Sequence, residues 1–226
     1  DRDPVSARAA LGLNPAAATV ALLPGSRASE VSLLAEPMVR AAALLANWHP
    51  GLQFVAAMAN ERVQSIFEEA MQGFFGAGIE LIRDRPRQVM AAADVVICAS
   101  GTATLETLLL KRPMVVAYRL SPLTVWLIRR LKLLKTPHVA LANLLTDQPY
   151  APEFIQEACE PDAMGRALLE FLENSKKCEQ ITEAYMGIHK KMRRNAAQTA
   201  ADAATAMTAT FMEPSVSSMR DLPWPS

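Results

Sequence analysis

Two turns of the chain combine glycine, hydroxyl residues and a charged residue in a way that suits an anionic ligand. The first turn lies in residues 22–27, which read Leu-Leu-Pro-Gly-Ser-Arg and separate a β-rich run from a helical pattern. Unpaired backbone amides at the start of that helix, the positive end of its dipole and the guanidinium of Arg27 would together bind a phosphate group. The alternative is a tight turn in which Ser26 or Ser29 caps the helix and Arg27 lies in solvent.

The second turn follows the most apolar of the predicted strands. Residues 99–106 read Ala-Ser-Gly-Thr-Ala-Thr-Leu-Glu, and Glu106 stands roughly one turn into the helix that follows. A carboxylate there can accept hydrogen bonds from both hydroxyls of a ribose whose phosphates rest on the amides of Gly101 and its neighbours. The alternative is that Glu106 is an acidic residue favoured near a helix N-terminus.

Together the two turns predict a site for a nucleoside diphosphate, because the phosphates and the ribose of such a ligand must be held at the same time. The sequence has no GxGxxG motif, which argues against a dinucleotide cofactor. No metal site is expected, because the cysteines and histidines show no ligand spacing. They are Cys98, Cys159, Cys178, His49, His138 and His189. Cys98 ends an apolar run, which predicts a buried thiol, and reduced thiols are typical of the cytoplasm.

The two turns belong to a series of strand and helix patterns. The expected strands cover residues 19–23, 53–57, 79–82, 95–99 and 114–118, and the helices after them cover 30–47, 61–72, 86–92, 102–111 and 122–134. This alternation predicts an α/β fold with a doubly wound parallel sheet and helices on both faces. Ligands of such sheets bind beyond the carboxyl ends of the strands, where both turns would lie.

The regular alternation of strand and helix patterns ends near residue 137. We expect a loop over residues 143–150, a short helix over 152–157, and carboxyl-terminal helices over 162–173 and 176–212, the last with a break near Gly187. The proline-rich residues 213–226 should form a flexible tail.

Composition excludes several classes of protein. The 226 residues are 51% hydrophobic and 20% charged, too apolar for a disordered chain, and no apolar run is long enough to span a bilayer. Lys and Arg total 23, as do Asp and Glu, so binding to nucleic acid through overall charge is not expected.

Charge is nevertheless uneven along the chain. Residues 107–146 contain seven Lys or Arg and no acidic residue. Within them, residues 121–135 place Trp126 among aliphatic side chains beside a basic flank, which is typical of a helix at a membrane surface. The alternative is a helix that packs on the sheet with its cations at the rim.

Four sequence blocks resemble, in the same order, those of lipid-A-disaccharide synthases. The blocks are residues 22–30, 99–106, 143–145 (Asn-Leu-Leu) and 152–156 (Pro-Glu-Phe-Ile-Gln), and the resemblance extends from about Leu11 to Ala206. It implies the nucleotide-sugar half of a GT-B glycosyltransferase. Such an enzyme transfers 2,3-diacylglucosamine from UDP to the 6-hydroxyl of 2,3-diacylglucosamine 1-phosphate, with inversion and without a metal or other cofactor, to give the β-1,6-linked lipid A disaccharide 1-phosphate and UDP.

The resemblance also implies roles for particular residues. Gly25, Ser26 and Arg27 would bind the diphosphate, with Arg27 as a catalytic residue that stabilises the leaving UDP. Ser100, Gly101 and Thr102 would add amide donors, Glu106 would hold the ribose, and Arg83 would lie in a segment that reads uracil. Asn143, Glu153 and Gln156 would line the donor sugar, with Asn143 also catalytic; alternatively, these three are ordinary loop and helix-cap residues.

In domain terms, the resemblance implies a UDP-sugar-binding Rossmann-like domain over residues 1–160, closing helices over 161–212 and the tail over 213–226, with no counterpart of an amino-terminal acceptor domain. The expected partners are the two lipid substrates and an anionic membrane surface, at a cytoplasmic, peripheral location on the inner membrane, and a homodimer is compatible with this. Three alternatives remain open: an epimerase on the same scaffold, an N-acetylglucosaminyltransferase on that scaffold, and a non-catalytic UDP-sugar-binding fragment.

Overall fold

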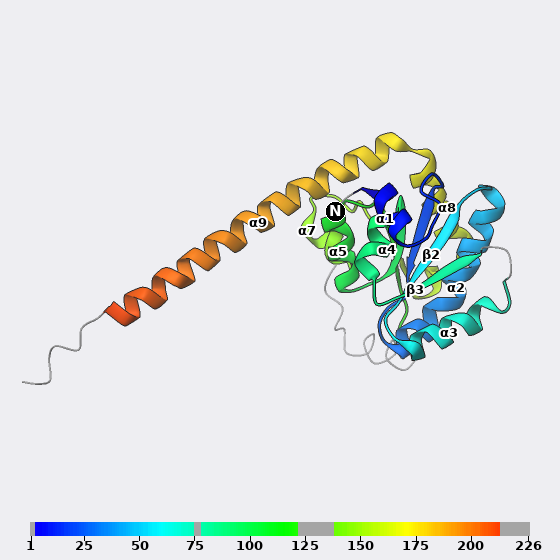
Figure 1. Ribbon diagram of the computed structural model, residues 1–226, viewed down its shortest axis with the longest axis horizontal. Helices are drawn as coiled ribbons and strands as arrows, with labels where there is room; N and C mark the ends of the chain where they lie inside the picture. Colours follow the sequence, from blue (N-terminus) through cyan, green and yellow to red (C-terminus); the bar gives the residue numbers. More distant parts are fainter. Residues whose placement is uncertain (1–2, 75–77, 122–137, 213–226) are drawn as a thin grey trace, which may run out of the picture. The chain divides into compact units, whose positions relative to one another are not determined.

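The computed structural model describes residues 3–74, 78–121 and 138–212, with side chains described as far as residue 194. The chain forms two compact units, Asp1–Met186 and Gly187–Ser226 (Figure 1). The helix expected over residues 122–134 and the tail over 213–226 lie outside the described residues.

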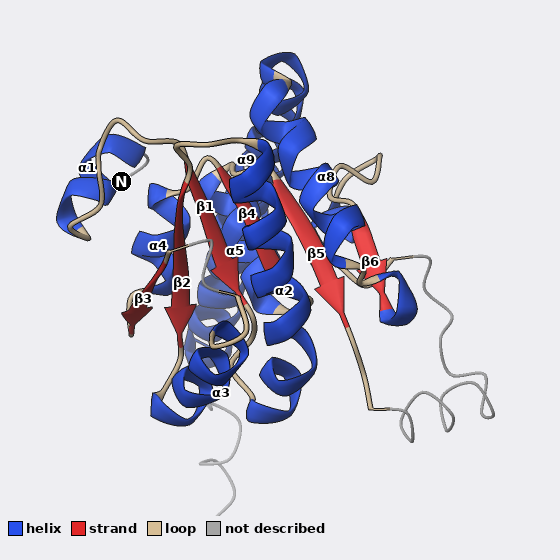
Figure 2. Cartoon of the chain, turned by 90° about the vertical axis from the view of Figure 1, so that its right-hand side faces the viewer, coloured by secondary structure: helices blue, strands red, loops and turns tan. Residues whose placement is uncertain are grey.

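The first unit is built on one parallel sheet of six strands in the order β3-β2-β1-β4-β5-β6. The strands are β1 (Thr19–Leu23), β2 (Gln53–Met58), β3 (Ile79–Arg83), β4 (Val95–Ala99), β5 (Met114–Tyr118) and β6 (Glu153–Ile155). The chain adds strands outward from β1 to β3 and then returns to place β4 on the other side of β1 (Figure 2). The expected doubly wound α/β fold is thus confirmed, and its strand order reverses between β1 and β4.

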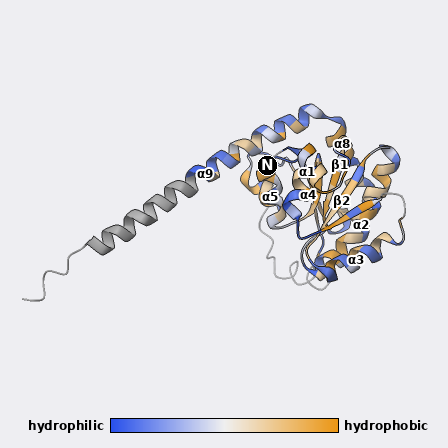
Figure 3. Cartoon of the chain, in the orientation of Figure 1, coloured by the Kyte–Doolittle hydropathy of each residue, from blue (hydrophilic) through white to orange (hydrophobic). Residues whose placement is uncertain are grey.

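The central strands are hydrophobic along their whole length, as parallel strands covered on both faces must be. Every residue of β1 and β4 is buried, whereas in the edge strand β3 only Ile79 is buried. In Figure 3, β2 is coloured mainly as hydrophobic, whereas α3 (Glu61–Met71) is coloured mainly as hydrophilic. The core therefore lies where β1, β2, β4 and β5 meet the helices.

Two layers of helices cover the sheet. One layer holds α2 (Ala28–Trp48), α3 (Glu61–Met71) and α8 (Pro161–Glu173), and α2 contacts both of the others. The other holds α1 (Pro4–Ala10), α4 (Pro86–Ala92), α5 (Thr102–Leu110) and α7 (Leu141–Leu145), which contact one another in series. Right-handed crossovers require this division, because the chain runs in opposite directions across the sheet on either side of the reversal.

The close contact between α8 and α2 depends on a glycine. A Cβ atom at Gly165 would lie 3.0 Å from Cζ3 of Trp48 and 3.4 Å from the carbonyl oxygen of Ala41. The guanidinium of Arg166 lies 5.0 Å from the centre of the Trp48 ring, a cation–π contact at the edge of the same interface. Helix α8 therefore packs directly on α2, against the sheet that carries the predicted turns.

An ion pair between a buried arginine and a partly exposed aspartate lies at the amino ends of the central strands. Arg8, on α1, donates to Asp94 at 2.7 Å and to the carbonyl oxygen of Ala92 at 2.8 Å. Asp94 also accepts from the backbone amide of Thr19 at 2.7 Å, at the start of β1. The sequence analysis did not predict α1. It did not predict the pair between Arg8 and Asp94 either, because these two residues are far apart in the sequence.

Two predicted elements of the carboxyl-terminal region were wrong. Residues 152–157 are not a helix: Glu153–Ile155 form β6, and only Gln156–Ala158 make a turn of 3-10 helix. The physical reason is pairing with β5, in which the Val116 amide donates to the carbonyl oxygen of Pro152 at 2.9 Å. The expected loop over residues 143–150 begins inside α7.

The long carboxyl-terminal helix is α9, Ser175–Met212, and it continues through Gly187 without the expected break. Within the first unit it buries Ile181 and Tyr185. In the described parts of the chain, every helix is too short or too polar to cross a lipid bilayer.

Candidate functional site

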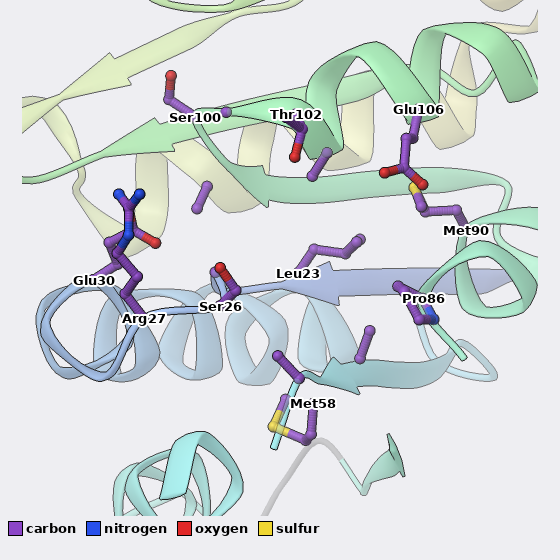
Figure 4. A pocket seen from close by; sticks show the side chains of 16 residues that line it. Leu23, Ser26, Arg27, Glu30, Met58, Pro86, Met90, Ser100, Thr102 and Glu106 are labelled. Carbon is purple, nitrogen blue, oxygen red and sulfur yellow. The ribbon is translucent and has the colours of Figure 1, made fainter. Parts of the chain in front are cut away.

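A cavity of about 390 Å³ lies at the carboxyl ends of β1, β2 and β4, where the strand order reverses. This volume is within the usual range for small-molecule sites. The cavity is lined by Leu23, Gly25, Ser26, Arg27, Glu30, Ala57, Met58, Ala59, Pro86, Met90, Ala99, Ser100, Gly101, Thr102, Ala103 and Glu106. Both turns singled out in the sequence therefore contribute to one site (Figure 4).

The first turn needs glycine for two reasons. Gly25 has φ of 119°, a conformation that residues with a side chain rarely adopt. A Cβ atom there would also lie 2.9 Å from Oε2 of Glu30. Helix α2 then begins with Arg27 as its N-cap and without a side-chain cap, so the alternative in which Ser26 or Ser29 caps the helix is wrong. The first amides of α2 thus remain available to an oxyanion.

Arg27 and Glu30 form an ion pair at one end of the cavity. Nη1 of Arg27 lies 3.3 Å from Oε1 of Glu30, and 79% of the Arg27 side chain is exposed. An exposed pair of this kind adds little to stability, and it uses only one of the five N–H donors of the guanidinium. The remaining donors of Arg27 suit an incoming anion.

The second turn supplies amides, although not from Ser100. The Ser100 amide donates to the carbonyl oxygen of Ala117 at 3.1 Å, and its hydroxyl donates to that of Val139 at 2.9 Å. The amide contribution expected from Ser100 is therefore already used inside the protein. Gly101, with φ of 145°, is the N-cap of α5 and carries no side-chain cap, so the next amides, of Thr102 and Ala103, lack helical partners.

Glu106 lies in the second turn of α5, toward the opposite end of the cavity from Arg27 (Figure 4). Its Oε2 lies 3.3 Å from Nε of Arg87, an exposed residue at the start of α4. The pairing is loose, so the carboxylate can accept further hydrogen bonds from ligand hydroxyls. One end of the cavity thus offers helix amides and a guanidinium that is paired with Glu30, and the other end offers the Glu106 carboxylate.

The wall near Glu106 is apolar, and sequence reasoning missed it. Pro86 and Met90, from the first two turns of α4, line this part of the cavity, and Met58, at the end of β2, lines it farther from Glu106 (Figure 4). A flat ring such as a nucleobase could rest one face on this wall. The carboxyl-end rule for parallel strands, applied to β2 as well as to β1 and β4, would have indicated Met58 and Ala59.

Arg83 is not among the residues that line the cavity. It ends β3 beside Met58, and its side chain turns to α3, where it lies 3.4 Å from Glu61 and donates to Gln64 at 3.0 Å. Its predicted contact with uracil stays a prediction, and these bonds give the side chain a local structural role.

The three residues expected near the donor sugar lie together but do not line the cavity. Asn143 is buried and donates through Nδ2 to Glu153 and to the Ala151 carbonyl, both at 2.7 Å. Gln156 has φ of 57°, and its carbonyl oxygen accepts from Nε of Arg119 at 3.1 Å. The side chains of Asn143 and Glu153 form hydrogen bonds within the protein. The sugar contacts expected of the three residues stay predictions.

Burial makes Cys98 chemically inert. Its side chain is fully buried at the end of β4, and this desolvation raises the pKa of the thiol to about 12. The thiolate is therefore negligible at neutral pH, and the interpretation of Cys98 as a small hydrophobic residue is confirmed.

Sequence comparison places the chain among proteins of one kind. The profile of the lipid-A-disaccharide synthetase family matches residues 1–207. The chain is 42% identical over 205 residues to the lipid-A-disaccharide synthase of Xylella fastidiosa (strain 9a5c), which covers 90% of this chain and 53% of the relative. It is 43% identical over 198 residues to that of Pseudomonas savastanoi pv. phaseolicola, covering 88% and 50%. The chain thus spans about half the length of the curated relatives it matches.

Solved structures of low sequence identity share the fold. The ADP-heptose lipopolysaccharide heptosyltransferase II of E. coli superposes with a TM-score of 0.56 at 13% identity, over 77% of this chain and 52% of that one. A glycosyltransferase from Rickettsia africae gives 0.56 at 10% identity, over 86% and 50%. The UDP-GlcNAc 2-epimerase of Neisseria meningitidis, bound to UDP-GlcNAc, gives 0.53 at 13% identity, over 85% and 48%.

The family profile covers most of the chain, and the fold is that of one half of GT-B glycosyltransferases. The family match confirms the resemblance seen in the sequence. The chain belongs to the lipid-A-disaccharide synthase family.

Proposed function

We propose that the chain is the UDP-sugar-binding half of a lipid A glycosyltransferase. The observation that carries the proposal is the cavity between the β1 and β4 turns, with Arg27 and the starts of α2 and α5 at one end and Glu106 at the other. In the proposed complex the diphosphate lies against Arg27 and the helix amides, and the ribose hydroxyls donate to Glu106. The uracil covers the apolar wall formed by Met58, Pro86 and Met90.

The proposed reaction transfers 2,3-diacylglucosamine from UDP to 2,3-diacylglucosamine 1-phosphate with inversion. The 6-hydroxyl oxygen of the acceptor bonds to C1 of the donor sugar as the bond from C1 to the UDP oxygen breaks. The electron pair stays on UDP, and the hydroxyl proton passes to a base. We place the acceptor and the base on the part of the relatives that this chain does not match.

The role of Arg27 follows from the charge that develops on UDP. As the bond to C1 breaks, negative charge grows on the diphosphate, and a fixed cation beside it stabilises the transition state more than the ground state. The amides of α2 and α5 act in the same direction. We therefore propose that these groups stabilise the leaving UDP without a metal ion or other cofactor.

An epimerase is the main alternative, because a UDP-GlcNAc 2-epimerase has the same fold. None of the cavity-lining residues in the described part of the chain is a histidine, and the matching family profile is that of the synthetase. Product analysis separates the two reactions, since an epimerase changes the donor sugar without an acceptor.

The 226-residue chain should bind UDP but should not transfer sugar. Its donor side is assembled, but transfer also requires an acceptor hydroxyl that is positioned and deprotonated from the opposite side. Calorimetry with UDP and a radiolabelled transfer assay measure the two properties. Failure to bind UDP would contradict the assigned site, and rapid transfer by this chain alone would contradict its half-site character.

Replacing Glu106 by Gln should weaken the binding of UDP and of uridine by similar factors, because the ribose is common to both. The loss of a hydrogen bond to a charged group costs about 1.5–3 kcal/mol, or roughly 10-fold or more in affinity. Glu36→Gln, at an exposed ion pair on α2, is the matched control. If a folded Glu106→Gln variant bound uridine as tightly as the wild type, Glu106 would not contact the ribose and would only be an acidic residue favoured near the start of a helix.

Arg27→Ala, made in a full-length protein that carries this chain, should lower kcat much more than it raises the KM for the donor. The reason is that the contact with the diphosphate strengthens toward the transition state. Arg40→Ala removes an arginine from an exposed ion pair on the same helix and should leave both constants unchanged. If Arg27→Ala changed only KM, Arg27 would be a ground-state clamp.

We further propose that the protein acts at the cytoplasmic surface of the inner membrane, through the basic residues 121–135. All of these residues but Ser121 lie outside the described residues, so the proposal rests on their sequence and on the acyl chains of the proposed substrates.

The chain should sediment with vesicles of anionic lipid and be released at about 0.5 M salt, where the Debye length falls to a few Å. Changing Arg129, Arg130, Lys132 and Lys135 together to Gln should have the effect of high salt. The same change at Lys190, Lys191, Arg193 and Arg194 of α9 removes equal charge as a control. Equal sedimentation of the first variant and the wild type would rule out this segment as the contact.

A further inference from the structure

Glu153 is a buried carboxylate whose oxygens are occupied by groups of one short segment. Its side chain is 8% exposed, and it accepts from the backbone amides of Val139 at 2.9 Å and Ala140 at 3.2 Å. It also accepts from Nδ2 of Asn143 at 2.7 Å and lies 3.5 Å from Nδ1 of His138. A buried carboxylate is retained only where such bonds replace its lost water, so this geometry holds residues 138–143 in one place.

Asn143 links the same segment to the backbone of Ala151. Its amide group donates to the carbonyl oxygen of Ala151 at 2.7 Å and accepts from the Ala151 amide at 2.9 Å. Ala151 leads directly into β6, which carries Glu153. Helix α7 and the residue before it are therefore attached to β6 at two points.

Val139 connects this network to the cavity. Its amide donates to Glu153, and its carbonyl oxygen accepts from Oγ of Ser100 at 2.9 Å. Ser100 lines the cavity and precedes Gly101, the N-cap of α5. The amide of Ala140, which also donates to Glu153, belongs to the same peptide unit as the Val139 carbonyl. A series of hydrogen bonds thus leads from Glu153 through one peptide unit to the turn where the diphosphate is proposed to bind.

We propose that Glu153 is a positioning residue for the nucleotide site, acting through Val139 and Ser100 without touching the ligand. The inference rests on the proposed function, because the affected ligand is UDP. It gives Glu153 a role different from the sugar contact that the family resemblance implies.

Glu153→Gln tests the role with little change in shape. An amide group replaces one carboxylate oxygen and brings a donor toward the amides of Val139 and Ala140 or toward Nδ2 of Asn143, so the segment must shift. The backbone pairing of β6 with β5 does not involve this side chain. Ser100→Ala interrupts the same series of bonds at the other end.

The experiment is a double-mutant cycle on UDP affinity, measured by calorimetry on the 226-residue chain, with urea unfolding of each variant. We expect each single variant to weaken UDP binding by about 3- to 10-fold, the range for one hydrogen bond. The double variant should bind within about twofold of the weaker single one, because the second change interrupts a series already broken. Glu160→Gln, an exposed carboxylate at the start of α8, should leave UDP affinity unchanged.

Two results would overturn the positioning role while leaving the proposed function in place. One is a loss of UDP affinity in the double variant equal to the product of the two single losses; the other is normal UDP affinity in Glu153→Gln. If the wild-type chain failed to bind UDP, the proposed function would fail first and the inference with it. Should Glu153→Gln not fold, the cycle is repeated with Glu153→Asp, which keeps the charge but shortens its reach to Val139, and the same two outcomes decide.

Discussion

The reversal of strand order between β1 and β4 is the constraint on which the site depends. Because each crossover is right-handed, the chain must leave β1 toward one face of the sheet and leave β4 toward the other. The two turns therefore separate at the carboxyl ends of adjacent strands and open a crevice between the starts of α2 and α5. Neither turn alone could enclose a ligand, and the reversal places both on one cavity.

The cavity has unlike ends, although the chain as a whole has no net charge. Arg27 and two helix starts supply positive potential locally, whereas Glu106 gives the opposite end a hydrogen-bond acceptor. Such a gradient fixes the direction in which an elongated ligand enters. The apolar wall of Met58, Pro86 and Met90 adds affinity without charge, so selectivity depends on the arrangement of a few side chains and not on overall composition.

Sequence patterns predicted the elements whose causes are local. Short runs rich in apolar residues, each followed by a helical pattern, identified the first five strands, and Gly25 and Gly101 marked turns that require unusual backbone angles. β6 could not be predicted, because three residues become a strand only through pairing with β5. The directions of Arg83 and Glu153 were equally inaccessible, because tertiary partners decide which way a polar side chain turns. The family resemblance singled out these two residues but did not indicate which groups their side chains contact.

The two edge strands of the sheet, β3 and β6, bear on whether the sheet can pair with another chain. An edge strand presents unpaired backbone groups that can recruit another chain into a growing aggregate. Here β6 is only three residues long, and β3 carries the charged residues Glu80 and Arg83, so both edges are poor templates for such growth. The fully buried strands β1 and β4 lie at the centre of the sheet, and its two borders discourage further pairing.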